Sequence, residues 1–169
     1  MIAAVDTNIL LDILIPDENY LKSSKALLDR YIEKGQLIIC EVVYAELASQ
    51  FSSDKDLKAF LSDTGIKLVY STEKSLYTAG ERWKEYTKSR KHTLQCPQCG
   101  KQITAVCAEC NYYFTFRQRI LSDFIIGAHA LLHANIFISR DRGFYKTYFK
   151  DLKIAWAKFK PLLNKELPS

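Results

Sequence analysis

The sequence predicts an α/β fold with a mainly parallel central sheet flanked by helices, together with a small metal-binding insertion. Short apolar runs alternate with longer segments of helical periodicity, and the connections between them are short. The composition changes abruptly at 91–116, a segment that contains four cysteines and an aromatic cluster. A length of 169 residues is enough for one domain with its own core and one small attached module.

The order of the elements follows from the spacing of apolar residues. Apolar runs predict strands at 2–5, 37–40, 66–70, 136–139 and 152–156. Helical spacing predicts helices at 7–14, 18–34, 41–51, 54–64, 73–90, 117–133 and 144–149, with Gly35 and Gly65 as natural stops for two of them. The helix at 117–133 is apolar on nearly every side, so we expect it to be buried.

Composition and charge narrow the class of protein. No stretch approaches the ~20 apolar residues needed to cross a bilayer, and the N-terminus lacks the pattern of a signal peptide. A cytoplasmic protein without a membrane partner is therefore expected. The net charge of +5 is concentrated in two basic zones, 82–119 and 140–160, while the rest of the chain is acidic. These zones favour a polyanion such as nucleic acid as the partner, and solvated basic faces are the alternative.

Four acidic residues occur where an unpaired charge is costly. Asp6 and Asp141 each follow a buried strand at the start of a helix, and the carboxyl ends of parallel strands meet at one edge of a sheet. Glu46 lies near the apolar stripe of its helix, and Asp123 stands early in the apolar helix. Capping and first-turn charges are the structural alternative. Carboxylates gathered at one edge would repel one another, and Mg²⁺ or Mn²⁺ would relieve that repulsion and activate water.

The inserted segment carries a second metal signal. Cys96, Cys99, Cys107 and Cys110 form a C-x₂-C-x₇-C-x₂-C pattern, which predicts a closed structural Zn²⁺ site of four thiolates. An iron site of the rubredoxin kind is the chemical alternative. We therefore divide the chain into a main domain, 1–91 and 117–169, and an inserted zinc-ribbon-like module, 92–116. Aromatic residues at 112–116 are expected either to stack on bases or to pack against the main domain.

Four segments, VDTNILLD, VVYAELAS, SDFIIGAHAL and IFISRDRGF, resemble the PIN-domain nucleases, and most of all the single-domain VapC-type toxins of toxin–antitoxin pairs. The resemblance covers 1–90 and 117–160, with the motifs in the family's order. It implies a Rossmann-like sheet, an endoribonuclease that depends on Mg²⁺ or Mn²⁺, and an RNA substrate. It also implies an antitoxin protein as a partner and a homodimer.

The resemblance assigns roles to five residues of the edge. Asp6 and Asp141 would be metal ligands, Asp123 would complete the metal shell, and Glu46 would hold a second metal or position the attacking water. Ser139 matches the family's hydroxyl residue two positions before the last acid. In such a mechanism water attacks in line and leaves 5′-phosphate and 3′-hydroxyl ends.

Further polar residues surround this set. Asn8 matches the family's polar residue beside the first acid, and helix capping is its other role. Arg140, Arg142 and Lys146, with Lys101 in the insertion, are candidate nucleic-acid contacts, although a solvated helix face also explains the cations after the last strand.

The insertion departs from the compact toxin pattern, so two other functions stay open. One is an RNA-processing or DNA-directed PIN nuclease outside toxin–antitoxin systems. The other is a non-catalytic zinc protein that binds nucleic acid. The basic zones favour a polymer over small phosphate esters as substrate.

Overall fold

A five-stranded parallel sheet forms the centre of the computed structural model, which describes residues 1–89, 94–95, 102–104, 106–112 and 120–158. The strand order is β3-β2-β1-β6-β7, and every pair in this sheet is parallel. The α/β prediction with a parallel sheet is confirmed. The strands are β1 Ile2–Val5, β2 Gln36–Ile39, β3 Lys67–Leu68, β6 Ile136–Ser139 and β7 Ile154–Trp156.

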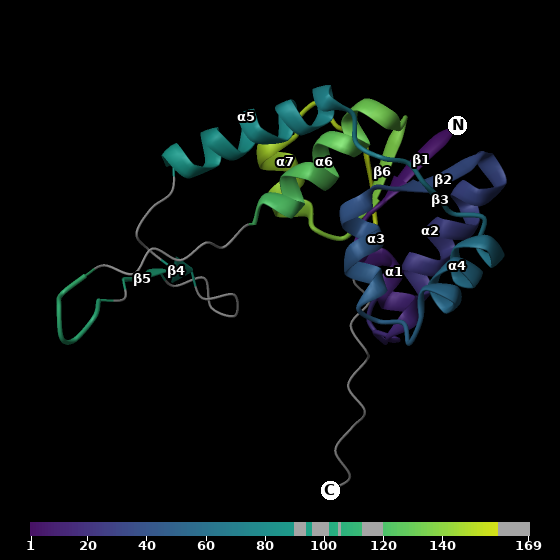
Figure 1. Ribbon diagram of the computed structural model, residues 1–169, viewed down its shortest axis with the longest axis horizontal. Coiled ribbons are helices and arrows are strands. Elements are labelled where there is room, and N and C mark those ends of the chain that lie inside the picture. Colours follow the sequence, from purple (N-terminus) through teal and green to yellow (C-terminus); the bar gives the residue numbers. More distant parts are fainter. Residues whose placement is uncertain (90–93, 96–101, 105, 113–119, 159–169) are drawn as a thin grey trace, which may run out of the picture.

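Helices cover both faces of this sheet. Figure 1 shows α5, α6 and α7 gathered on one side of β6, and α1, α2 and α4 on the other side of the molecule. The helices are α1 Thr7–Leu14, α2 Leu21–Lys34, α3 Glu41–Ala48, α4 Asp54–Asp63, α5 Glu73–Ser89, α6 Leu121–His133 and α7 Arg142–Tyr148.

The observed boundaries depart from the predicted ones where polar turns compete with regular structure. The strand predicted at 66–70 shortens to Lys67–Leu68, at the edge of the sheet. The second helix begins at Leu21 rather than at residue 18, because the Asp17 carboxylate accepts a hydrogen bond from the Asn19 backbone N–H and forms a turn there. Helix α6 begins at Leu121, and the predicted start at 117–119 lies outside the described residues.

Helix α6 is buried in the core, as its apolar pattern predicts, and the core also extends to α1, α2, α3 and α4. Phe124 of α6 is fully buried, and its ring contacts aromatic rings from α5, α7 and the residue after α7. Aromatic pairs of this kind favour tilted and edge-on contacts, which are the geometries observed. The N-terminal end of α6 is thereby held next to α5 and α7; the ring partners of Phe124 are Trp83, Tyr86, Phe144, Tyr148 and Phe149.

The sheet topology also determines where a ligand would bind. Strands β2 and β3 lie on one side of β1, and β6 and β7 lie on the other, so the order reverses between β1 and β6. In open parallel sheets, ligands bind beyond the carboxyl ends of the strands at such a reversal. Val5 pairs with Ile138 in the register of these two strands, so their carboxyl ends lie side by side.

The described part of the insertion contains a small hairpin. Strands β4 Leu94–Gln95 and β5 Gln102–Ile103 pair antiparallel, and Figure 1 shows them apart from the main sheet. A turn follows at 107–112, where the backbone N–H of Cys107 donates to the Tyr112 carbonyl and that of Asn111 donates to the Cys107 carbonyl. Asn111 has φ 55°, a left-handed conformation that asparagine tolerates better than most residues. Among the helices of the described residues, none has the length and apolar character that a membrane span requires.

Candidate active site

Asp6 occupies the junction between β1 and α1, yet its side chain does not cap the helix. Its backbone is extended, as at an N-cap, but the carboxylate accepts no hydrogen bond from a backbone N–H in the first turn of α1. Instead, Asp6 Oδ2 accepts hydrogen bonds from Ser139 Oγ at 2.6 Å and from Asn8 Nδ2 at 2.7 Å. Asp6 is 5% exposed. The carboxylate is therefore held beside β6 by two side chains, one of them from the neighbouring strand.

The turn after β6 is organised around the Ser139 hydroxyl. Ser139 is fully buried, donates to Asp6, and accepts the backbone N–H of Asp141 at 3.0 Å. Asp141 is half-buried, and its Oδ1 accepts the backbone N–H of Phe144 at 3.1 Å, so this aspartate does cap its helix. One carboxylate oxygen of Asp141 thus serves α7, while Ser139 links the two strand–helix junctions.

The other two predicted acids come from helices on either side of these junctions. Glu46 of α3 is half-buried and accepts a hydrogen bond from the hydroxyl of Thr7, the buried residue after Asp6. Asp123 is half-buried in the first turn of α6, where its Oδ2 accepts the backbone N–H of Ile120 at 3.3 Å. Both acids therefore have a partner that fixes them near the carboxyl end of the sheet.

Electrostatics ties three of these acids together. Burial, together with the charges of Asp123 and Glu46, raises the pKa of Asp6 to about 7, against the hydrogen bonds from Ser139 and Asn8, which lower it. Neighbouring like charges disfavour ionisation in this way only when the groups are close enough to interact. The structure thus brings Asp6 into electrostatic contact with Asp123 and Glu46.

The donor set suits a hard divalent cation. Carboxylate and hydroxyl oxygens are the ligands of Mg²⁺ and Mn²⁺, and a cation would offset the burial and repulsion that raise the Asp6 pKa. Within the described ranges, no three His, Cys, Asp or Glu side chains are already grouped as a metal site. The acids that fit such a cation therefore lie near one another but are not arranged as a complete ligand shell.

The structure places Arg140 in an ion-pair network rather than at an open surface. Its Nη1 donates to Asp12 Oδ1 at 2.5 Å and to Asp17 Oδ2 at 3.1 Å, and its guanidinium lies 4.8 Å from the centre of the Tyr20 ring. Asp12 is 1% exposed and also accepts the Ser24 hydroxyl at 2.6 Å. Burial raises the pKa of Asp12, against the hydrogen bond from Ser24 and the charge of Arg140.

Sequence reasoning missed Thr7 and Asp12. Thr7 follows the first acid directly, but nothing local indicates that its partner is Glu46, which is 39 residues away along the chain. Asp12 did carry a signal, because it stands between Leu11 and Ile13 in a short and otherwise apolar helix. An acid in that setting requires a partner, as Glu46 does.

The remaining predicted contacts are described only in part. Lys146 is exposed, and its Nζ lies 6.0 Å from the centre of the Trp156 ring. The side chain of Arg142 lies outside the described residues, as do Lys101, Cys96 and Cys99. Cys107 is half-buried and Cys110 exposed; backbone N–H groups of Cys110 and Glu109 lower the pKa of the Cys107 thiol. Such N–H groups favour the thiolate, which is the form that binds metal.

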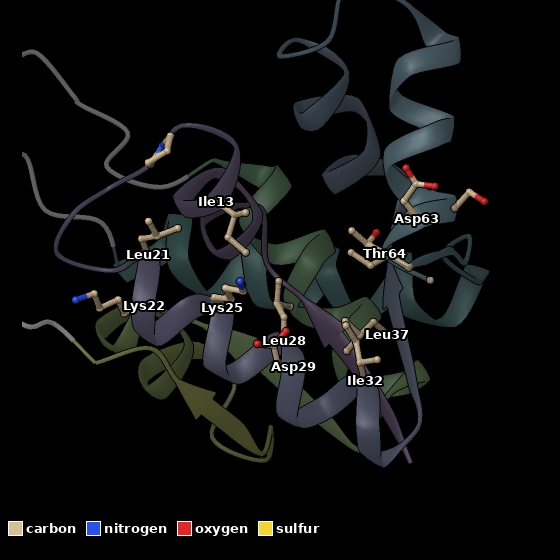
Figure 2. A pocket seen from close by; sticks show the side chains of 14 residues that line it. Ile13, Leu21, Lys22, Lys25, Leu28, Asp29, Ile32, Leu37, Asp63 and Thr64 are labelled. Atoms are coloured by element: carbon tan, nitrogen blue, oxygen red, sulfur yellow. The ribbon is translucent and has the colours of Figure 1, made fainter.

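An apolar groove of about 910 Å³ lies apart from the acids, between α2 and the segment that follows α4. Figure 2 shows Leu21, Lys25, Leu28 and Ile32 on successive turns of α2, with Asp63 and Thr64 across from them. None of the four predicted acids lines it. The groove therefore has the character of a docking surface for an apolar segment rather than of a catalytic cleft.

Comparison with known proteins agrees with this geometry. The family model of the PIN domain matches residues 3–150. Among curated proteins, none matches this chain. Solved structures with the same fold include a chain of VapBC2 from Rickettsia felis bound to a DNA fragment from its promoter, with a TM-score of 0.58, 16% identity, and coverage of 94% of this chain and 100% of that one.

Two further structures are similar to the same extent. VapBC-1 from nontypeable Haemophilus influenzae has a TM-score of 0.58 and 18% identity, over 92% of this chain and 98% of that chain. A toxin–antitoxin complex from Klebsiella pneumoniae has a TM-score of 0.57 and 16% identity, over 94% and 99%. At this level of identity the similarity establishes the fold.

Proposed function

Because the chain belongs to the PIN-domain family, whose members are nucleases, we propose that it is an endoribonuclease dependent on Mg²⁺ or Mn²⁺. The observation that carries this proposal is the state of Asp6. Its buried carboxylate caps no backbone N–H of α1 and is held by the side chains of Ser139 and Asn8, within reach of the charges of Asp123 and Glu46. A helix cap needs none of these features, whereas hydrogen-bond partners that orient the carboxylate are typical of a metal ligand.

Each polar side chain of the edge has a role in this proposal. Asp6, Asp123 and Asp141 would hold the cation, which when bound supplies positive charge and an activated water. Glu46, oriented by the Thr7 hydroxyl, would hold a second cation or orient that water for in-line attack at phosphorus. Cleavage by this mechanism would leave 5′-phosphate and 3′-hydroxyl ends on the RNA.

The direct test is cleavage of structured and unstructured RNAs by the purified protein, with and without Mn²⁺. Asp6→Asn and Asp141→Asn should each abolish cleavage, whereas Glu33→Gln, which removes an exposed acid at the end of α2, should leave it unchanged. Cleavage that survives both aspartate substitutions, or that needs no metal, would falsify the proposal.

The same assay separates the rival functions. Preference for single-stranded DNA would favour a DNA-directed nuclease, and tight RNA binding without cleavage would favour a non-catalytic binding protein. We propose a toxin because the matched structures named above come from toxin–antitoxin complexes. Expression of the chain alone in the cytoplasm should then arrest growth, and Asp6→Asn should relieve the arrest.

The antitoxin is the partner that best fits the apolar groove. A helix with an apolar stripe would bury the groove floor, and Lys22 and Lys25 would pair with acids on that helix. Ile32→Glu should prevent co-purification with the antitoxin encoded beside this chain, because it places a charge on the groove wall. Tyr77→Glu, on the exposed face of α5, is the matched control and should leave co-purification intact.

A structural Zn²⁺ in the insertion is the second metal that we propose. The Cys107 turn offers a thiol with a lowered pKa, and the other cysteine pair falls in sequence between β4 and β5. The purified chain should therefore release zinc on titration with a mercurial reagent, and Cys107→Ser should release less. Release of iron, or of no metal, would contradict this assignment.

The family resemblance also leads us to propose a homodimer. Size-exclusion chromatography with light scattering tests the proposed homodimer.

A further inference from the structure

Arg140 connects the two parts of the chain that carry the candidate metal ligands. Its backbone N–H donates to Asn8 Oδ1 at 3.2 Å, and its Nη1 donates to Asp12 Oδ1 at 2.5 Å. Asn8 and Asp12 are four residues apart on α1, so they share one face of that helix. One face of α1 therefore holds both the backbone and the side chain of Arg140, the residue between Ser139 and Asp141.

The guanidinium of Arg140 is held from further directions. Asp17 accepts from the same Nη1 at 3.1 Å, and the Tyr20 ring lies against the guanidinium. Asp12 is in turn anchored to α2 by the Ser24 hydroxyl. A side chain with this many fixed partners cannot reorient without breaking several of them, so the turn that carries it is equally constrained.

We infer that Arg140 and Asp12 are positioning residues, which fix the turn between β6 and α7, and with it Asp141, against the end of α1 that follows Asp6. The catalytic consequence rests on the proposed function, since it matters there that the two aspartates keep one separation. A buried ion pair is a weak source of net stability, because desolvation of both charges offsets their attraction. Its contribution here is directional: it sets where the turn lies.

The chain contains a second arginine–aspartate pair, away from the four candidate metal ligands. Arg82 Nη2 donates to both carboxylate oxygens of Asp151, at 3.0 and 3.1 Å, and its guanidinium lies 4.8 Å from the Phe149 ring centre, the same distance as between Arg140 and Tyr20. This pair joins α5 to the segment after α7. Loss of this pair should leave the turn after β6 in place.

Hydrogen exchange of three backbone amides tests the inference without any metal. The amides of Arg140, Asp141 and Phe144 donate to Asn8, Ser139 and Asp141, so they report on this turn directly. They should exchange faster in Asp12→Asn and in Arg140→Gln, and no faster in the double variant than in either single one. Arg82→Gln should leave them unchanged. Asp12→Asn keeps the size of the side chain and an acceptor for Ser24, which guards against simple misfolding.

Mn²⁺ affinity, measured by calorimetry on the same variants, tests the catalytic consequence. Loss of the positioning pair should weaken Mn²⁺ binding about tenfold, the lower end of the range for partners that orient metal ligands. Unchanged exchange at the three amides, or equal acceleration in Arg82→Gln, would overturn the inference. Faster exchange with wild-type Mn²⁺ affinity and cleavage would overturn its catalytic part. A wild-type chain that neither binds Mn²⁺ nor cleaves RNA would sink the proposed function instead, and the exchange data would still decide on the turn.

Discussion

Asp6 and Asp141 occupy the same kind of position in the sequence but do different work in the structure. Both stand between a buried strand and a helix, and Asp141 caps α7 by accepting the Phe144 N–H. Asp6 leaves the first turn of α1 without a side-chain cap and accepts hydrogen bonds from Ser139 and Asn8 instead. Asp6 therefore forgoes a cap that would contribute about 1 kcal/mol, which supports the metal-binding role proposed above.

The raised pKa of Asp6 leads to a prediction about metal binding and pH. With a pKa of about 7, Asp6 is largely protonated below neutrality, so a proton competes with the cation for the same carboxylate. The apparent affinity for Mn²⁺ should therefore rise as the pH increases from 6 to 8. Calorimetric titrations at several pH values measure this directly.

Ser139→Ala sharpens the same prediction. The Ser139 hydroxyl lowers the pKa of Asp6, so its removal should shift the midpoint of the pH dependence upward. Ser49→Ala, which removes an exposed hydroxyl that donates to the Glu46 carbonyl and accepts from the Gln50 side-chain amide, is the control and should not shift it. A midpoint that stays in place in Ser139→Ala would contradict the assignment of Asp6 as the titrating ligand.

At the scale of elements, helix α6 approaches the Phe149 ring closely at Gly127. A Cβ added at Gly127 would lie 2.7 Å from the Phe149 ring, closer than van der Waals contact allows, and both residues are buried. Gly127→Ala should therefore lower the free energy of unfolding by about 1–3 kcal/mol, the usual cost of overpacking. Urea denaturation measures it.

Gly80 of α5 is the matched control for that substitution. Nothing lies within 4 Å of a Cβ added there, so Gly80→Ala should gain the better helix propensity of alanine and stabilise the protein by up to about 1 kcal/mol. Equal effects of the two substitutions would mean that Phe149 moves aside and that α6 is not held by this contact.

Elements were predictable from the sequence to the extent that their signals are local. The apolar run before Asp6 and the one before Asp141 gave both strands their observed bounds, Ile2–Val5 and Ile136–Ser139. The strand at 66–70 was predicted too long, because alternation does not reveal that the register with β2 ends at Leu68, with one further bond from the Val69 N–H to the Ile39 carbonyl. Pairing depends on the neighbouring strand, which local sequence does not specify.

At the scale of the whole molecule, the fold class and the edge of the sheet that carries Asp6 and Asp141 followed from periodicity and topology alone. The hydrogen bonds that organise that edge did not. Thr7 with Glu46, and Arg140 with Asp12, join residues 39 and 128 positions apart, so only the folded chain brings them together. Arg140 was predicted as a contact for nucleic acid, and the structure pairs its half-buried side chain with Asp12 and Asp17, which the sequence did not indicate.

Stability against pH is a property of the whole molecule on which two buried groups act in opposite directions. Burial and the neighbouring His133 lower the pKa of His129 to about 4, from the ordinary histidine value of 6.5. The unfolded chain therefore binds more protons there, and acidification from pH 6.5 to 4 destabilises the fold. Asp6 has a pKa raised from 3.8 to about 7, so the folded chain binds more protons and acidification over that range stabilises it. The two contributions oppose each other between about pH 4 and 6.5.

Single substitutions should separate these contributions in buffer without Mg²⁺ or Mn²⁺. Asp6→Asn removes the stabilising contribution of Asp6 protonation. The free energy of unfolding of this variant should therefore fall more steeply than that of the wild type as the pH decreases from 6.5 to 4. His129→Gln removes the destabilising contribution of His129 protonation, so the stability of this variant should fall less, or rise, over the same interval. Urea denaturation at each pH gives the three curves, and the differences between them cancel groups that titrate alike in all three proteins. Parallel curves would mean that neither buried group titrates as the structure requires, and that water reaches the side chains of both Asp6 and His129.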